Sequence, residues 1–326
     1  MKLLTIDNGG DGAAGVLLEC GEILHLARAA LPGTAEPWLP AGLKEILCGG
    51  AQGLDIVRRM AARAAAQDGA GRQRLRESGA LLPGSTPLLA PIPKPGLVLA
   101  AGLAYRSHLA EMAGTPPPPH PTGFIKSPHS VTGPHANVAV PPAAPHHIDY
   151  EGELAVVFGR RCHAVTADEA LDHVAGYTVA NDISARDWVR DVWSAETPWD
   201  ARRTWEVNIM GKQYPGFTPL GPVLLTADEV PDAGRLRIIT RLNGRLMQDA
   251  PVSDMLFSIA ETIAHFSRWY AFEPGDVLLT GTPAGVGAGR MPPVFMADGD
   301  VIEVAIEGIG ALRNVIRANT GERSAA

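Results

Sequence analysis

The chain has 326 residues, of which 46% are hydrophobic and 19% are charged, so it contains enough apolar material for a full core. This composition excludes a disordered chain. The 28 Lys and Arg residues and the 35 Asp and Glu residues give a formal net charge of −7. This mildly acidic balance argues against a nucleic-acid or polyphosphate partner, because both bind to basic surfaces. The 36 Gly and 28 Pro residues favour many turns and short strands over helical bundles.

The N-terminal residues and the cysteines bear on the cellular compartment. The segment Met1–Asp7 reaches an acidic residue before any long apolar stretch, which predicts that it is not a signal peptide. The longest apolar run, Leu97–Ala104, is far shorter than the ~20 residues that a membrane helix needs. Cys20, Cys48 and Cys162 are scattered, so we expect three small buried apolar side chains rather than a disulfide framework or a thiolate metal site. A soluble cytoplasmic protein with no membrane partner is therefore expected.

Residues 1–90 are predicted to form a small N-terminal α+β domain. Apolar residues at helical spacing predict a surface helix over Leu54–Ala66, and the alternating charges of Arg72–Glu77 indicate a solvent-exposed helix face. The proline-rich segment Pro91–Gly96 is stiff and extended, so it marks a domain boundary. Three short strands are expected before these helices, at Lys2–Ile6, Gly15–Glu19 and Glu22–Leu26.

Residues 97–320 are predicted to form a larger domain that is mainly β with some α. Many strands with few intervening helices indicate an α+β fold whose core is a barrel or roll. No internal repeat is visible. The expected strands are Leu97–Ala101, Gly123–Ile125, Val138–Val140, Gly152–Phe158, Tyr177–Ala180, Val223–Thr226, Leu236–Leu242, Val277–Thr280 and Val301–Ile306.

Three helices are predicted in this larger domain. A short one covers Ser107–Ala113 and is ended by Gly114, before a stiff polyproline loop. The other two begin with capping boxes. They are formed by Thr166 with Glu169, in a helix that Gly176 ends, and by Ser258 with Glu261, in a helix that continues towards Tyr270.

Acidic residues gather at the start of one predicted strand. The two-residue period of a strand places Glu151 and Glu153 on the same face, with Gly152 leaving room on the opposite face for another backbone or a ligand. Two negative charges on neighbouring positions of one strand face repel each other, so either a cation must bind or the pKa of one acid must be raised. A third acid, Asp182, follows the predicted strand Tyr177–Ala180. Three converging carboxylates suit Mg²⁺ or Ca²⁺. From residue type alone, a pair of solvated glutamates is the commoner outcome.

A second constellation is His108 with Glu111. Residues three apart share a helix face, so the glutamate can fix the imidazole tautomer and stabilise its protonated form. Such a dyad can activate a water molecule. A surface ion pair is the alternative interpretation.

These segments occur in an order that resembles the fumarylacetoacetate hydrolase family, over about residues 97–315. Residues 1–90 match only in being a small N-terminal domain, as members often have. The segments that carry the resemblance are Tyr105–Glu111, Phe124–Lys126, Asp149–Val157, Asn181–Asp187, Gly211–Lys212, Pro219–Pro222, Leu279–Gly287, Gly299–Glu303 and Glu307–Gly310.

The resemblance implies a distorted β-roll or barrel core, a homodimer, and one Mg²⁺ (or Mn²⁺ or Ca²⁺) per active site. Carried over by position, the metal ligands are Glu151, Glu153 and Asp182. The catalytic dyad is His108 with Glu111, on a segment that members often order only when a ligand binds. Further residues would contact the oxygens of an oxo-acid substrate: Lys212, which is also a catalytic candidate, and Thr282, followed by Tyr105, Arg106 and Lys126.

The sequence also departs from the family pattern. Ala104 stands where an Asn commonly precedes the Tyr, and Val189 stands where many members place a substrate-contacting Gln. These changes leave the metal site intact but make the substrate uncertain. Residues 190–210 match no subgroup of the family, and two roles are open for their tryptophans: lining a pocket for an apolar or aromatic substrate arm, or packing at a dimer interface. They are Trp193, Trp199 and Trp205.

The remaining candidates have simpler interpretations. The glycine-rich segment Gly285–Gly289 is expected to turn tightly beside the site rather than to hold a phosphate. Arg186 and Asp187 are expected to pair with each other and to brace the loop that carries Asp182. The neighbouring His146 and His147 are expected to face solvent. Three other histidines have no partner at a telling spacing, namely His129, His135 and His265.

The function predicted from the resemblance is metal-dependent hydrolysis of a carbon–carbon bond in a 1,3-dicarbonyl acid such as an acylpyruvate. His108, oriented by Glu111, would deprotonate the attacking water, and Lys212 would stabilise the enolate product. The alternative within the family is decarboxylation or tautomerisation of a 2-oxo acid. A third alternative is a catalytically silent binding protein, in which the acids would pair with Arg or Lys instead of a metal.

Overall fold

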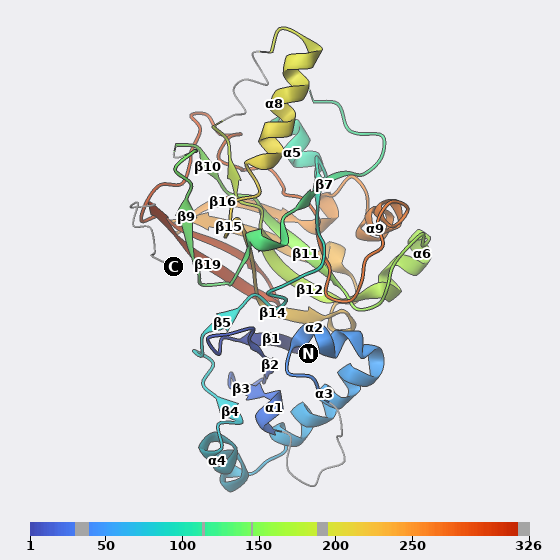
Figure 1. Cartoon of the computed structure of the whole chain (residues 1–326), viewed down its shortest axis with the longest axis vertical. Coiled ribbons are helices and arrows are strands. Elements are labelled where there is room, and N and C mark those ends of the chain that lie inside the picture. The colour runs from blue at the N-terminus through green and yellow to red at the C-terminus, as the bar shows by residue number, and fades with distance from the viewer. Residues whose placement is uncertain (30–38, 113–114, 145, 188–194, 319–326) are drawn as a thin grey trace.

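The computed structural model describes residues 1–29, 39–112, 115–144, 146–187 and 195–318, and its elements are labelled in Figure 1. The N-terminal part consists of short strands covered by helices on one side (Figure 1). Its strands are β1 (Lys2–Ile6), β2 (Ala13–Leu17), β3 (Ile23–His25), β4 (Leu81–Leu82) and β5 (Leu88–Leu89). Its helices are α1 (Leu26–Ala29), α2 (Leu43–Cys48), α3 (Gly50–Ala65) and α4 (Gly69–Glu77).

The rest of the described chain consists mainly of strands. These are β6 (Val98–Gly102), β7 (Thr122–Lys126), β8 (Val131–Thr132), β9 (Asn137–Val140), β10 (Ile148–Asp149), β11 (Gly152–Phe158), β12 (Val174–Asn181), β13 (Ser184–Ala185), β14 (Thr218–Thr226), β15 (Arg237–Leu242), β16 (Arg245–Pro251), β17 (Val277–Leu279), β18 (Val301–Ile306) and β19 (Gly310–Ala318). The helices are α5 (Arg106–Glu111), α6 (Ala167–Ala170), α8 (Pro198–Met210) and α9 (Ile259–Ser267). The expected α+β class is confirmed.

Two sheets face each other, and the first contains strands of both parts of the chain. The first runs in the order β4-β3-β2-β1-β14-β12-β11-β17-β6-β7, and the second in the order β16-β15-β18-β19-β9. Strand β11 packs against β15 and β18, and β12 packs against β18 and β19, so the core lies between the sheets. All residues of β11 and β12 are buried, as expected for central strands that are covered on both faces.

The N-terminal strands belong to the first sheet. Lys2 and Leu3 of β1 pair antiparallel with Leu225 and Leu224 of β14, and Figure 1 shows the N-terminal part lying directly below these central strands. Apolar side chains from both parts also share one core cluster, in which Leu3 packs together with residues such as Ala155. The division into residues 1–90 and 97–320 stays a prediction, but hydrogen bonds of one sheet connect the two parts.

The register between β11 and β12 positions the site. The two strands pair antiparallel, with Gly152 opposite Asn181 and Glu153 opposite Ala180. The first residues of β11 and the residue after β12 therefore meet at the same edge of the sheet. Gly152 is required here, because a Cβ would lie 2.2 Å from Thr240 Oγ1 of the facing sheet. The expected close approach at this glycine is confirmed.

Some expectations from the sequence are wrong. Gly176 does not end a helix: α6 ends at Ala170, a short 3₁₀ turn follows, and Gly176 lies within β12. Cys20 and Cys48 are exposed and only Cys162 is buried, because the first two lie in a turn and at a helix end. No helix in the described part of the chain has both the length and the apolar character of a transmembrane segment.

Candidate active site

Three acidic side chains converge at the edge where β11 begins and β12 ends. Glu151, Glu153 and Asp182 expose only 6%, 1% and 1% of their surface. A carboxylate oxygen from each lies within 4.8 Å of the other two. The backbone fixes this arrangement, because Asp182 donates its N–H to the carbonyl oxygen of Glu151 at 2.9 Å. The predicted convergence of the three acids is therefore present, and they are not solvated glutamates.

Buried cations neutralise part of this negative charge. Lys212 Nζ lies 2.7 Å from Glu151 Oε2, 2.7 Å from Asp182 Oδ2 and 2.7 Å from Ser184 Oγ. Lys126, which is fully buried, donates to Asp182 Oδ1 and to the carbonyl oxygen of Phe217. Among the described residues, no Lys or Arg forms an ion pair with Glu153.

The pKa values of Glu151 and Glu153 are shifted in opposite directions. Burial alone would raise the pKa of Glu151, but the Lys212 ammonium and the Arg186 guanidinium outweigh burial and hold that pKa well below its usual range. Burial raises the pKa of Glu153 well above its usual range, and repulsion from Asp182 and Glu151 adds to this effect. Glu153 is thus the acid whose charge the protein itself leaves least compensated.

The donor set fits a hard divalent cation. Counting Asp149, four buried acids meet three cationic side chains, so a cation added beside Glu153 would reduce the repulsion that acts on it. Carboxylate oxygens at this spacing are the ligands that Mg²⁺, Mn²⁺ and Ca²⁺ prefer. The pairing of acids with Lys and Arg expected of a silent protein is present, but it does not extend to Glu153. These acids could therefore hold a divalent metal.

The His108–Glu111 dyad is formed on α5. His108 Nδ1 lies 3.1 Å from Glu111 Oε2, and the two side chains are only 11% and 13% exposed, so this is not a surface ion pair. Glu111 Oε1 accepts a hydrogen bond from the Gly285 N–H at 2.9 Å. The glutamate is therefore fixed from two sides, and Nε2 of the imidazole is left for proton transfer. His108 is close enough to Glu151 to contribute to the lowering of that residue's pKa.

One short loop, residues 281–285, connects the acidic cluster with the dyad. At its first residue, the Gly281 N–H donates to Glu153 Oε2 at 2.7 Å. At its last residue, the Gly285 N–H donates to Glu111 at 2.9 Å. Between them, Thr282 Oγ1 donates to the carbonyl oxygen of Gly152 at 3.0 Å. The loop thus sets the spacing between a proposed metal ligand and the proposed acid–base pair.

Three of the predicted substrate contacts already form hydrogen bonds within the protein. Arg106 donates to main-chain carbonyl oxygens of residues 254–256, and Lys126 is bound to Asp182. The Thr282 hydroxyl donates to Gly152 and accepts from Gln248 Nε2 at 2.8 Å. Tyr105 is fully buried, and its hydroxyl has no hydrogen-bond partner among the described residues. A substrate would have to displace contacts of Arg106, Lys126 or Thr282, and the role of all four residues in substrate binding stays a prediction.

Comparison with known proteins supports a family assignment for this arrangement. The family pattern described as Fumarylacetoacetate (FAA) hydrolase C-terminal matches residues 97–317, which include the acidic cluster, the dyad and the loop. The chain belongs to the fumarylacetoacetate hydrolase family. As a member of this family it is an enzyme, and the resemblance seen in the sequence is confirmed.

Several relatives of this chain are named oxaloacetate tautomerases, from mammals to bacteria. Oxaloacetate tautomerase FAHD2B, mitochondrial, from Bos taurus is 38% identical over 282 residues, which cover 86% of this chain and 81% of that protein. Oxaloacetate tautomerase YisK from Bacillus subtilis (strain 168) is 41% identical over 231 residues, which cover 70% of this chain and 72% of that protein. The solved structure of a fumarylacetoacetate hydrolase from Exiguobacterium antarcticum has a TM-score of 0.75 and 32% identity, and the match covers 98% of this chain and 99% of that chain.

No role was assigned from the sequence to two buried residues of this site, Asp149 and Gln248. Asp149 accepts hydrogen bonds from the Gly287 N–H at 2.6 Å and the Ala288 N–H at 3.1 Å, and it pairs with Arg186 at 3.1 Å. Gln248 accepts from the Gly152 N–H at 2.9 Å and donates to Thr282 and to the Pro283 carbonyl oxygen. Asp149 lies two residues before Glu151, so its spacing could have identified it, although the structure places it on β10 rather than on β11. Gln248 lies on β16, a strand that the sequence did not predict.

The predicted ion pair between Arg186 and Asp187 is wrong. Arg186 pairs instead with Asp149 and Glu151, because these buried carboxylates need a cation more than a partly exposed one does. Asp187 accepts hydrogen bonds from the backbone N–H groups of His146 and His147. The tight turn expected at Gly285–Gly289 is confirmed, since the Gly289 N–H donates to the Val286 carbonyl oxygen at 3.2 Å. Other N–H groups of this segment donate to Asp149 and Glu111.

Other candidates lie away from the acids or outside the described residues. His265 has a partner after all, because its ring stacks on that of His120 with centroids 5.1 Å apart. Trp199 on α8 is 62% exposed, with the Arg202 guanidinium 5.3 Å from its ring centroid. The expectations for Gly114, Val189, Trp193 and the side chain of Trp205 fall outside the described part of the structure. His129 and His135 are exposed.

Proposed function

We propose that this enzyme interconverts the enol and keto forms of a 2-oxo dicarboxylic acid of the oxaloacetate type. The observation that carries the proposal is the His108–Glu111 dyad beside a convergent set of three buried carboxylates. The substrate class is suggested by the two relatives, which are 38% and 41% identical and are both named oxaloacetate tautomerases. We further propose that Mg²⁺, Mn²⁺ or Ca²⁺ binds to Glu151, Glu153 and Asp182.

The chemistry requires one proton to leave the enol oxygen and one to be added to the adjacent carbon. A divalent cation bound to the acids would supply Lewis acidity towards the oxygens of the 2-oxo acid. Glu111 holds Nδ1 of His108, so the imidazole can accept the enol proton at Nε2 and return it to carbon. The Lys212 ammonium, held between Glu151 and Asp182, adds positive charge near the developing negative oxygen. Protons balance, because the substrate and the product are isomers.

Hydrolysis of a carbon–carbon bond in an acylpyruvate is the second candidate. It is favoured by the match to the Exiguobacterium antarcticum fumarylacetoacetate hydrolase. The same dyad would then deprotonate a water molecule that adds to the distal carbonyl carbon, and the carbon–carbon bond would break to give a carboxylic acid and a 2-oxo acid. Decarboxylation of oxaloacetate would use the acidic cluster and a proton donor, but it would depend less on the dyad.

The test uses the purified full chain with and without Mg²⁺. The enol form of oxaloacetate is added, and the decay of its ultraviolet absorbance is compared with the uncatalysed rate, while mass spectrometry identifies products from oxaloacetate and from a panel of acylpyruvates. We expect accelerated ketonisation with no loss of mass. His108→Ala should abolish the acceleration without changing the affinity for Mg²⁺, whereas His135→Ala, a change at an exposed histidine, should change neither.

Other results would favour a different reaction or contradict the proposal. Loss of CO₂ would favour a decarboxylase, and cleavage of an acylpyruvate would favour the hydrolase. A wild-type protein that leaves all these substrates at the uncatalysed rate under saturating Mg²⁺ would contradict the proposal. If His108→Ala lost both activity and Mg²⁺ binding, the separate roles of dyad and acids would be wrong.

A further inference from the structure

Helix α5, which carries the dyad, cannot be stable through its own contacts. It contains six residues, Arg106–Glu111, and isolated helices need roughly 12–15 residues to be even marginally stable in water. Its N-cap residue, Tyr105, provides no side-chain hydrogen bond to the first turn. The position of His108 and Glu111 must therefore be fixed by other elements of the fold.

The first of these elements is the segment that follows β16. Asp254 Oδ2 accepts hydrogen bonds from the Ser107 N–H at 3.0 Å and from Ser107 Oγ at 2.5 Å. The carboxylate of a distant residue thus supplies the cap that Tyr105 lacks, and its negative charge lies at the positive end of the helix. Arg106 donates to carbonyl oxygens of the same segment, and the Leu256 N–H donates to the Ala104 carbonyl oxygen at 2.7 Å.

The second element is the loop 281–285. Ser107 Oγ, while donating to Asp254, accepts a hydrogen bond from the Ala284 N–H at 3.2 Å. The Ser107 hydroxyl therefore lies between the Asp254 carboxylate and the loop that contacts Glu153 at one end and Glu111 at the other. One continuous chain of hydrogen bonds runs from Asp254 through Ser107 to the residues that space the dyad from the acidic cluster.

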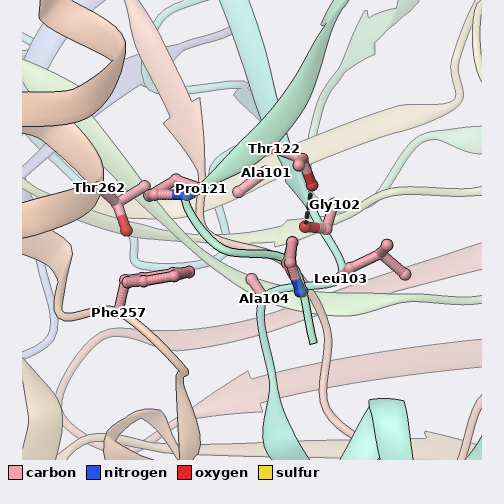
Figure 2. Close-up of a pocket in the computed structure, with 9 residues that line it drawn as sticks. Ala101, Gly102, Leu103, Ala104, Pro121, Thr122, Phe257 and Thr262 are labelled. Carbon is pink, nitrogen blue, oxygen red and sulfur yellow. Dashed lines mark hydrogen bonds between the residues drawn. The ribbon is translucent and has the colours of Figure 1, made fainter. Parts of the chain in front are cut away.

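The conformation of the turn before α5 also indicates that contacts from other elements hold the helix in place. Figure 2 shows Gly102, Leu103 and Ala104 at the end of β6, with Phe257 across a small pocket from Ala104. Leu103 has a φ of 55°, a left-handed conformation that costs about 1–2 kcal/mol for a bulky residue. A strained turn does not hold the following helix in place by itself, so external contacts must do so.

We propose that Asp254, acting through Ser107, is a positioning residue that holds the His108–Glu111 dyad at a fixed place relative to Glu151, Glu153 and Asp182. Neither residue belongs to the acidic cluster, and neither is assigned here to substrate or metal. The proposal rests on the proposed function in so far as its kinetic test uses the tautomerase reaction. Its structural test does not depend on that reaction.

The experiment compares Ser107→Ala, Ser107→Thr and Asp254→Ala with the wild type. Ser253→Ala is the matched control, because Ser253 is the exposed neighbour of Asp254. We expect kcat to fall about 10- to 100-fold in Ser107→Ala and Asp254→Ala, since a misplacement of about 1 Å can cost 10²-fold in rate. KM and the affinity for Mn²⁺ should stay within about twofold, and Ser107→Thr, which keeps the hydroxyl, should recover most of kcat.

Hydrogen exchange of residues 105–111 is the readout that does not need activity. The amides of α5 should exchange faster in Ser107→Ala and Asp254→Ala than in the wild type, while those of β11 and β12 should not change. Unchanged exchange in both variants would overturn the proposal, as would a Mn²⁺ affinity that falls in parallel with kcat. If the wild type has no tautomerase activity, the proposed function fails, and the exchange data alone still decide the role of Asp254.

Discussion

Replacing Lys212 by Met tests how the acidic cluster is stabilised. Lys212 forms 2.7 Å contacts with Glu151 and Asp182, and its side chain is 8% exposed. Met keeps the apolar stem but removes the charge, so two buried carboxylates lose their shared cation. Breaking a buried ion pair in this way typically costs about 3–5 kcal/mol. For 326 residues, an unfolding entropy of about 0.7 kcal/mol per degree converts this cost to a decrease in Tm of about 4–7 °C.

The assay is thermal unfolding of wild type and Lys212→Met, in chelator and in saturating Mg²⁺. In chelator we expect the full decrease. In Mg²⁺ the decrease should be clearly smaller, because the metal neutralises the same carboxylates. The control is Lys94→Met, which removes a pair with Asp11 whose side chains are 77% and 84% exposed. Exposed pairs contribute little, so its Tm should change by less than about 1 °C.

Two results would refute this reasoning. An unchanged Tm of Lys212→Met in chelator would mean that the lysine does not compensate the acids. An equal decrease with and without Mg²⁺ would mean that the metal does not bind where Glu151 and Asp182 meet. In the second case the proposed metal site would be wrong, even if the protein is active.

Three further predictions concern other contacts. Gly289→Ala should reduce activity at least about tenfold, because the new Cβ would lie 2.2 Å from Glu111 Cδ and would push the carboxylate away from the imidazole, as steady-state kinetics can measure. Ser258→Ala should lower the free energy of unfolding by about 1 kcal/mol in chemical denaturation, because it removes the cap of α9 that Ser258 shares with Glu261. His25→Gln should make the free energy of unfolding less sensitive to acid. Burial, and then the Arg28 charge, lower the pKa of His25 in the folded protein. The unfolded chain therefore binds the proton first, and the wild type loses stability as the pH falls below about 6.5.

The first of these predictions has a matched control variant, and each of the three has a result that would contradict it. Gly69→Ala places a Cβ where nothing lies within 4 Å, so its activity should equal that of the wild type. If Gly289→Ala is as active, Glu111 is free to move without consequence. For Ser258, an unchanged denaturation midpoint would show that the capping box contributes nothing measurable. For His25, equal loss of stability in wild type and variant between pH 7.5 and 5.5 would contradict the role of its burial.

The sequence predicted the acids of the site better than their partners. The two-residue period of a strand placed Glu151 and Glu153 together, and the two acids do converge although β11 begins one residue after Glu151. Asp182 followed from its place at a strand end. The partner of Arg186 was missed, because adjacency in sequence suggested Asp187 whereas the buried charges of Asp149 and Glu151 decide the pairing.

Contacts that depend on distant elements could not be read from the sequence. Strand β16 carries charged and exposed residues without regular alternation, so Gln248 gave no sign that it lies beneath the loop 281–285. Asp254 has the sequence context of an ordinary turn residue, yet it caps a helix almost 150 positions earlier in the chain. Propensity and period describe a residue's own element, and neither reports which other element will pack against it.

The pairing of β1 with β14 limits how this enzyme can be dissected. A shortened chain without its first 90 residues would present the backbone groups of Leu224 and Leu225 as a free apolar edge, which favours aggregation or strand exchange between copies. Chimaeras in which the N-terminal segment comes from a relative therefore need a suitable linker. They must also keep the register between β1 and β14, in which Lys2 lies opposite Leu225. Along the chain, residues 1–90 resemble a separable domain. In the folded protein, their strands complete the sheet that contains β11 and β12.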